Sequence, residues 1–164
     1  MQTSESANRF LVDRMLVRLG KYLRIAGCDA AWDLSLPTHE LILRANGEGR
    51  VFLTRNRHLP DNHPRPDRWV LLESDDPVAQ FQSLVSTLGL DTASGLFRNC
   101  IRCNLPLLDV ADKAEIQTRV HPNVYARHDA FHRCPSCGTV FWKGSHVRNT
   151  CAKLGLPLPA DTRG

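Results

Sequence analysis

The sequence predicts an α/β domain built around a parallel sheet, followed by a small second domain. Short apolar runs alternate with segments of helical period through residues 1–90, and paired cysteines replace that pattern afterwards. The expected strands are residues 9–13, 28–32, 50–54 and 69–73, and the expected helices are 14–26, 38–46 and 76–88. Residues 58–68 contain three prolines and are expected to form a loop.

The pattern inside each segment supports these elements in order. The first strand is an apolar run that ends at Asp13, and Gly27 is placed to end the helix that follows. That helix carries apolar side chains on one face and Arg14, Arg18, Lys21 and Arg24 on another. The last helix of the domain turns Val78, Phe81, Leu84, Val85 and Leu88 to one side. Such alternation of strands and helices is typical of a parallel sheet covered by helices.

Composition and charge restrict the class of protein. With 42% hydrophobic and 23% charged residues, the chain resembles an ordinary globular protein. It has no run of eighteen apolar residues and no export signal, so we expect no membrane partner and a reducing, cytoplasmic location. Residues 91–164 hold 10 Lys and Arg against 6 Asp and Glu, whereas residues 1–90 hold 11 of each. This excess suits a polyanionic partner such as RNA, or simply a solvated basic surface.

The second domain is marked by two C-x-x-C pairs. Cys100 and Cys103 form the first, and Cys134 and Cys137 form the second, 30 residues later. Each pair can aim two sulfur atoms at one ion, and two pairs complete a closed tetrahedral site of the structural Zn²⁺ type. A redox role for either pair is the alternative. A helix at 112–119, with a capping box at its start, is expected between the pairs.

The predicted organisation has five parts. They are a disordered lead-in at 1–8, the α/β domain at 9–90, a linker at 91–98, a zinc ribbon at 99–149 and a loose tail at 150–164.

Acidic and amide side chains follow three of the expected strands. Asp13 follows the first, Asn56 the third, and Asp75 and Asp76 the fourth. The carboxyl ends of parallel strands meet at one edge of a sheet, where carboxylates can share a divalent cation such as Mg²⁺ or Mn²⁺. Such an ion would suit phosphodiester hydrolysis. An aspartate after a strand is also a common helix N-cap, and Asp75 or Asp76 could serve only as that.

Several stretches together resemble the PIN-like ribonuclease domain family named after the C-terminal part of the Mut-seven protein. The stretches are residues 10–16, 23–29, 49–55, 74–77 and 141–146, together with the cysteine pairs. The resemblance spans about residues 9–149 and implies a three-layer α/β/α fold, a zinc ribbon and metal-dependent cleavage of RNA. The metal ligands it implies are Asp13, Asp75 and Asp76, and the residues that would contact RNA are Arg14, Arg24, Arg55, Lys143 and His146.

The chain departs from the family pattern at two positions. The family usually has an aspartate where Asn56 stands, and an acid near Thr38, for which Glu40 or Asp33 could substitute. The sequence therefore leaves three hypotheses open. The first is a ribonuclease that uses Asp13, Glu40, Asn56, Asp75 and Asp76. The second is a catalytically impaired domain that binds RNA, and the third is a zinc-stabilised protein adaptor.

Overall fold

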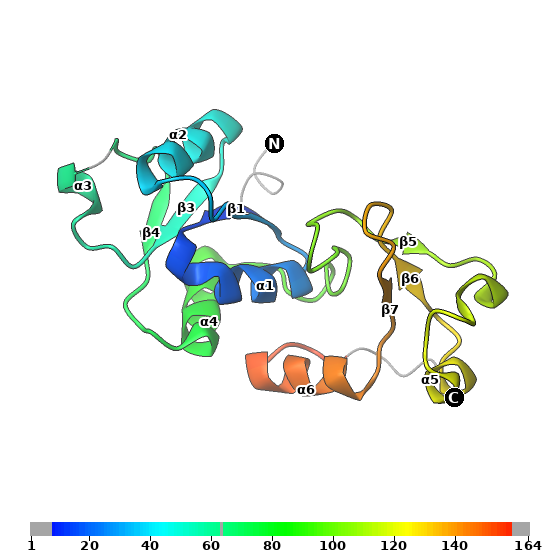
Figure 1. Ribbon diagram of the computed structural model, residues 1–164. Helices are drawn as coiled ribbons and strands as arrows, with labels where there is room; N and C mark the ends of the chain where they lie inside the picture. The colour runs from blue at the N-terminus through cyan, green and yellow to red at the C-terminus, as the bar shows by residue number, and fades with distance from the viewer. Residues whose placement is uncertain (1–7, 63, 159–164) are drawn as a thin grey trace, which may run out of the picture.

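A four-stranded parallel sheet forms the centre of the N-terminal part of the protein (Figure 1). The computed structural model describes residues 8–62 and 64–158. The strand order is β2-β1-β3-β4, with β1 at Arg9–Val12, β2 at Asp29–Ala31, β3 at Val51–Thr54 and β4 at Trp69–Leu71. All neighbours are parallel, as predicted, and β2 and β4 are the edge strands.

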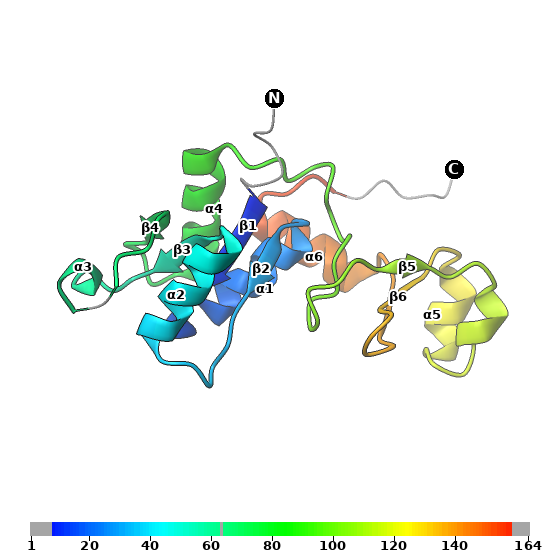
Figure 2. The same cartoon turned by 90° about the horizontal axis from the view of Figure 1, so that it is seen from above.

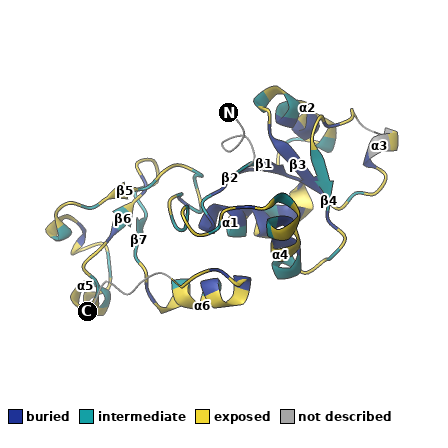
Figure 3. Ribbon diagram, turned by 180° about the vertical axis from the view of Figure 1, so that it is seen from behind, coloured by how far each residue is buried: buried dark blue, intermediate teal, exposed yellow. Residues whose placement is uncertain are grey.

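Helices cover both faces of this sheet. The helical elements are η2 (Arg14–Leu16), α1 (Val17–Ile25), α2 (Thr38–Glu48), α3 (Leu59–Asn62) and α4 (Pro77–Leu88). Phe10 and Val12 of β1 pack with α1 and α4, whereas Leu11 packs with α2 on the opposite face. Successive side chains of a strand point to opposite faces, so the sheet is buried on both sides between helices (Figure 3). The predicted three-layer α/β/α arrangement is confirmed.

A second, antiparallel sheet follows in the C-terminal part. It consists of β5 (Leu108–Asp109), β6 (His132–Arg133) and β7 (Val140–Phe141), with η3 (Lys113–Ile116) and α5 (Pro122–Arg127) between β5 and β6. We refer to residues 99–144 as the ribbon. The helix predicted at 112–119 is only the 3-10 turn η3, which is capped by the Asp112 carboxylate through a hydrogen bond from the Ala114 amide.

The chain then returns to the α/β domain through α6 (Ser145–Leu154), which lies beside α1 and α4 in both views (Figures 1 and 2). Residues 145–149, which the sequence places in the second domain, begin this helix. The tail predicted to be loose from residue 150 is instead packed through Leu156. Cys151, Leu154 and Leu156 are buried in the same apolar cluster as Phe81 and Leu84, which explains why the segment is helical. The lead-in up to residue 7 and the tail from residue 159 lie outside the described residues.

The connection at 91–98 packs closely against the end of α1. The Phe97 amide donates to the Ile25 carbonyl oxygen at 2.9 Å. Gly27 has φ +89°, and a β-carbon there would lie 2.1 Å from the Gly95 carbonyl oxygen. Both the backbone angle and the close approach require glycine at position 27. This contact fixes the path of the chain into the ribbon. No helix in the described segments is long and apolar enough to cross a membrane.

Candidate functional site

The sulfur atoms of Cys100, Cys103, Cys134 and Cys137 lie within 4.8 Å of one another. The Sγ atoms of Cys100 and Cys137 are 3.8 Å apart. A tetrahedral Zn²⁺ with bonds of about 2.3 Å separates its sulfur ligands by about 3.8 Å. Four sulfur donors at this spacing fit a closed zinc site, and leave no position for substrate. The cluster could therefore hold zinc in a structural role.

The two cysteine pairs adopt the same local backbone. The Cys100 amide donates to the carbonyl oxygen five residues on, and so does the Cys134 amide. Asn104 and Gly138 follow the second cysteine of each pair, and both have a left-handed backbone, with φ of +59° and +68°. The amide of each donates back to the carbonyl oxygen of the first cysteine. The two turns present their sulfur atoms in equivalent ways, as a symmetric metal site requires.

The thiols of the cluster sit in different environments. Burial raises the pKa of the Cys100 thiol to about 12. Hydrogen bonds with the side chain and backbone of Thr139 lower the pKa of Cys137 to about 6. A divalent cation must displace the proton of a buried thiol such as Cys100, so metal binding would release protons.

The first cysteine turn is attached to the edge of the parallel sheet by side-chain hydrogen bonds. Arg24, near the end of α1, donates through Nη1 to the carbonyl oxygens of Ile101 and Arg102 at 2.7 and 3.0 Å. The Asn104 side chain accepts from the Ala30 amide at 3.2 Å and donates to the Asp29 carboxylate. The turn therefore covers the free edge of β2, which would otherwise be open to pairing with another strand.

Arg24 is thus a structural residue, and the prediction that it contacts RNA is wrong. Its side chain is only 5% exposed. Its Nε also donates to the Ala30 carbonyl oxygen at 2.7 Å, and its guanidinium lies 3.5 Å from the centre of the Trp32 ring. Burial lowers the pKa of Arg24 to about 10. Sequence analysis missed this role because helical period alone grouped Arg24 with the exposed cations of α1.

The substitution Arg24→Ala is expected to lower the free energy of unfolding by about 3 kcal/mol, because one buried and two partly buried carbonyl oxygens would lose their donor and the packing against Trp32 would be lost. Urea denaturation followed by circular dichroism measures this change. Lys21→Ala, which removes an exposed cation from the same helix, is the matched control and should shift stability by less than about 0.5 kcal/mol. Equal effects of the two substitutions would contradict the structural role.

Asp13 lies at the carboxyl end of β1 and is only 2% exposed. Its Oδ1 accepts from the Arg14 backbone amide at 2.8 Å, and its Oδ2 accepts from the Thr54 hydroxyl at 2.7 Å. The same hydroxyl accepts from the Asn56 amide at 3.0 Å. Within the described residues, the partners of this carboxylate are neutral donors. A buried carboxylate is commonly paired with a cation or coordinates a metal, and no cationic side chain within residues 8–62 and 64–158 pairs with this one.

The other predicted catalytic residues lie at the ends of neighbouring elements, but do not crowd around Asp13. Glu40 is exposed in the first turn of α2, and its carboxylate lies 3.9 Å from His39. The Asn56 side-chain oxygen accepts from the His58 amide at 3.0 Å. Asp76 caps α4 by accepting from the amides of Val78 and Ala79, so the capping interpretation is confirmed for Asp76. Asp75 is exposed beside it.

Among the described residues, the cysteines are the one group of three or more His, Cys, Asp or Glu side chains whose ligand atoms lie within 4.8 Å of one another. The acids at the edge of the sheet therefore do not form a preassembled cluster. Mg²⁺ often binds through only one or two carboxylates together with water and phosphate oxygens. Asp13 is held in place by its two hydrogen bonds, and Asp75 is exposed after β4, two strands away from β1.

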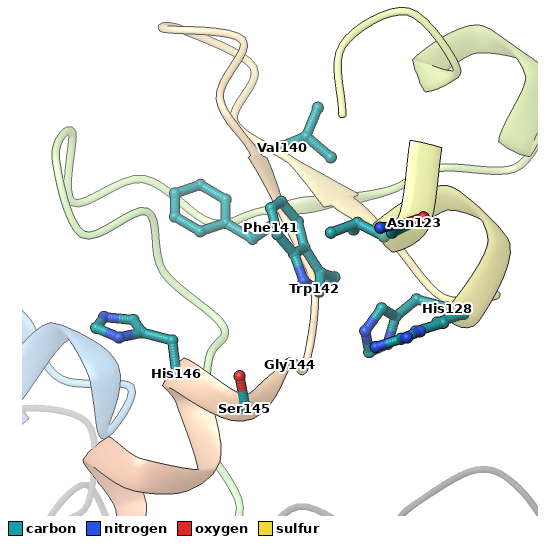
Figure 4. A pocket seen from close by; sticks show the side chains of 10 residues that line it. Asn123, His128, Val140, Phe141, Trp142, Gly144, Ser145 and His146 are labelled. Carbon is teal, nitrogen blue, oxygen red and sulfur yellow. The ribbon is translucent and has the colours of Figure 1, made fainter. Parts of the chain in front are cut away.

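The remaining predicted RNA contacts fall in two places. Arg14 and Arg55 are exposed at the carboxyl edge of the sheet, where Arg55 donates to the Glu73 carbonyl oxygen. Lys143 and His146 are exposed where β7 leads into α6. His146 is one of the residues that line a pocket of about 390 Å³, and Figure 4 shows the side chains of that lining.

The fold and the cysteine cluster together define an α/β domain with an appended zinc-ribbon unit. A family model described as the Mut7-C RNAse domain matches residues 8–154. Because the match covers most of the chain, the protein belongs to the Mut7-C RNase domain family, and the predicted resemblance is confirmed. No curated protein and no solved structure matches the chain.

Proposed function

We propose that the protein is a metal-dependent ribonuclease that cleaves RNA phosphodiester bonds at the carboxyl edge of the parallel sheet. The observation that carries the proposal is the buried Asp13 carboxylate, which lacks a cationic partner among the described side chains. Membership of a ribonuclease family supports the choice of RNA as substrate.

The residues around Asp13 have separate roles in this proposal. Asp13, Asp75 and the Asn56 amide would hold a Mg²⁺ or Mn²⁺ ion, which would supply an activated water and neutralise charge on the phosphate. The Thr54 hydroxyl fixes the orientation of the Asp13 carboxylate. Gln80 is buried and donates to the Ser74 carbonyl oxygen at 2.8 Å, which holds the loop that carries Asp75. The exposed guanidinium groups of Arg14 and Arg55 would bind phosphate.

The second candidate function is a catalytically impaired domain that binds RNA. The neutral amide of Asn56 favours it, because an amide oxygen is a weaker ligand for a hard cation than a carboxylate. In that case the exposed cations of the sheet edge and ribbon would bind RNA without cleavage. A protein adaptor stabilised by zinc is the third candidate, and would show no salt-dependent binding of RNA.

The purified chain, incubated with labelled single-stranded and hairpin RNA, tests the proposal directly. Cleavage is expected with Mn²⁺ or Mg²⁺ and not with Ca²⁺, whose larger size and looser geometry suit catalysis poorly. Ca²⁺ is a better control than a chelator, because a chelator would also strip the cysteine site. If the chain binds RNA but does not cleave it with any of these ions, the impaired RNA-binding domain is supported. If it neither binds nor cleaves RNA, the protein adaptor is the remaining candidate.

The substitution Asn56→Asp is expected to raise the cleavage rate about tenfold at limiting Mn²⁺, because a carboxylate adds a charged ligand beside Asp13. The new carboxylate can keep the hydrogen bond from the His58 amide, so folding should be unaffected. The measurement is the cleavage rate over a Mn²⁺ titration. Asn149→Asp, at an exposed position of α6, is the control for an added charge. A rate equal to the parent's would show that Asn56 does not limit metal binding.

A further inference from the structure

A pocket lies at the junction of α5, β7 and α6, away from the sheet edge that carries Asp13. It has a volume of about 390 Å³ and is formed by ten residues (Figure 4). The lining includes Arg127, His128, Trp142, Gly144 and His146. This volume is within the range of small-molecule sites. We refer to it as the ribbon pocket.

The lining combines basic and aromatic groups. Arg127 and His128 come from the end of α5, and His146 from the first turn of α6. Trp142 lies between them and is half-buried. None of the ten lining residues, all in the described part of the chain, is acidic. The pocket is therefore complementary to an anion attached to a flat ring.

Gly144 keeps the floor of this pocket open. A β-carbon at position 144 would lie 2.9 Å from Trp142 Nε1 and 4.0 Å from His128 Nε2. Its backbone has φ −92°, which any residue can adopt, so the glycine is required by space and not by backbone angle. The indole and imidazole nitrogens thus both approach one point beside the glycine, where a ligand's polar atoms can reach them.

We propose that the ribbon pocket binds one unstacked nucleotide of single-stranded RNA, with its base against Trp142 and its phosphate at Arg127 and His128. The proposal rests on the proposed action on RNA. Proteins recognise single strands by stacking splayed bases on aromatic rings while cations hold the backbone. A base inside a duplex is already stacked and cannot enter a pocket of this kind, so the pocket selects single strands.

The position of the pocket has a consequence for substrate length. Asp13 precedes α1, whereas Arg24 near the other end of that helix contacts the ribbon. The sheet edge and the contact between α1 and the ribbon lie at opposite ends of that helix, which is about 14 Å long for its nine residues. RNA held in the pocket would therefore have to extend beyond the bound nucleotide to reach Asp13, and a fragment too short to do so would gain nothing from the pocket.

Fluorescence anisotropy with a labelled 12-nucleotide single strand tests the pocket independently of cleavage. The full chain carrying Asp13→Asn serves as the background, so that RNA is not consumed. Arg127→Ala and Gly144→Val are each expected to weaken binding about tenfold. Arg133→Ala removes an exposed cation from β6 outside the pocket, and should change binding less than twofold.

A blunt duplex of the same length should bind at least tenfold more weakly than the single strand. Zinc content reports folding of each variant.

If the Arg127→Ala and Arg133→Ala variants bind RNA equally well, the pocket does not bind the nucleotide. The proposal is also contradicted if the duplex binds as tightly as the single strand. Arg127 is exposed, so its removal tests the site even if Gly144→Val fails to fold. The outcome is separable from the nuclease proposal. If the parent binds single strands selectively but does not cleave them, the ribonuclease proposal is wrong and the pocket proposal stands. If the parent cleaves RNA but binds single strands and duplexes equally well, the pocket proposal is wrong and the ribonuclease proposal stands.

Discussion

Replacing Cys134 by serine is expected to remove zinc from the protein, to unfold the ribbon, and to lower the free energy of unfolding by several kcal/mol. Cys134 is 1% exposed and belongs to the four-sulfur cluster. Serine cannot replace a thiolate as a zinc ligand, and three cysteines do not close the tetrahedral site.

The ribbon has little else to hold it together. Apart from its cysteines, the buried apolar side chains among its residues are Ile116 and Phe131. Burying two such side chains contributes about 3–6 kcal/mol, whereas a structural zinc contributes about 10 kcal/mol or more in small peptides. Zinc binding is therefore the larger stabilising term. Its loss should spread to β2, since Arg24 and Asn104 join the first cysteine turn to that edge.

Zinc content per chain and the thermal unfolding midpoint measure the effect. Cys151→Ala is the matched control, because Cys151 is buried but outside the cluster. That variant should keep one equivalent of zinc. A Cys134→Ser protein with one equivalent of zinc and an unchanged midpoint would contradict a structural metal site.

How much the sequence can predict depends on whether a feature is local. The cysteine pairs and the apolar periods are local patterns, and the strands, the parallel sheet and the sulfur cluster follow from them. The role of Arg24 and the packing of α6 depend on contacts across the chain. Arg24 reaches residues 77 and 78 positions away, and Leu156 packs against an apolar cluster formed mainly by the N-terminal domain. No spacing in the sequence predicts either contact.

The sheet edge illustrates the same limit at the candidate catalytic site. The position of Asp13 after the first strand is predictable, because parallel strands align their carboxyl ends. The side-chain environment is not. Thr54 and the Arg14 amide occupy both Asp13 oxygens, and Asp76 is engaged in capping α4. Hydrogen bonds of this kind decide how each carboxylate is oriented, and each Asp13 oxygen keeps a second lone pair that a cation can use.

The substitution Asp13→Asn is expected to reduce metal-dependent cleavage at least about a hundredfold while leaving the fold intact. The amide oxygen of asparagine can accept from the Arg14 amide as the carboxylate does. Its amide nitrogen can donate to the Thr54 hydroxyl, which has a second lone pair beside the one that accepts from the Asn56 amide. The proton of the buried Thr54 hydroxyl loses its acceptor, so the free energy of unfolding should fall by about 1–3 kcal/mol, which leaves the protein folded. What is lost is the negative charge that a divalent cation requires.

Asp91→Asn is the matched control for this test. Asp91 is exposed and accepts hydrogen bonds from the Ala93 and Ser94 amides, so the same chemical change occurs far from the sheet edge. Cleavage rates of the two variants over a Mn²⁺ titration, with urea denaturation for stability, separate loss of charge from loss of fold. If Asp13→Asn cleaves RNA as fast as Asp91→Asn, the carboxylate is not a metal ligand. Its burial would then reflect only the two hydrogen bonds that join β1 to η2 and β3.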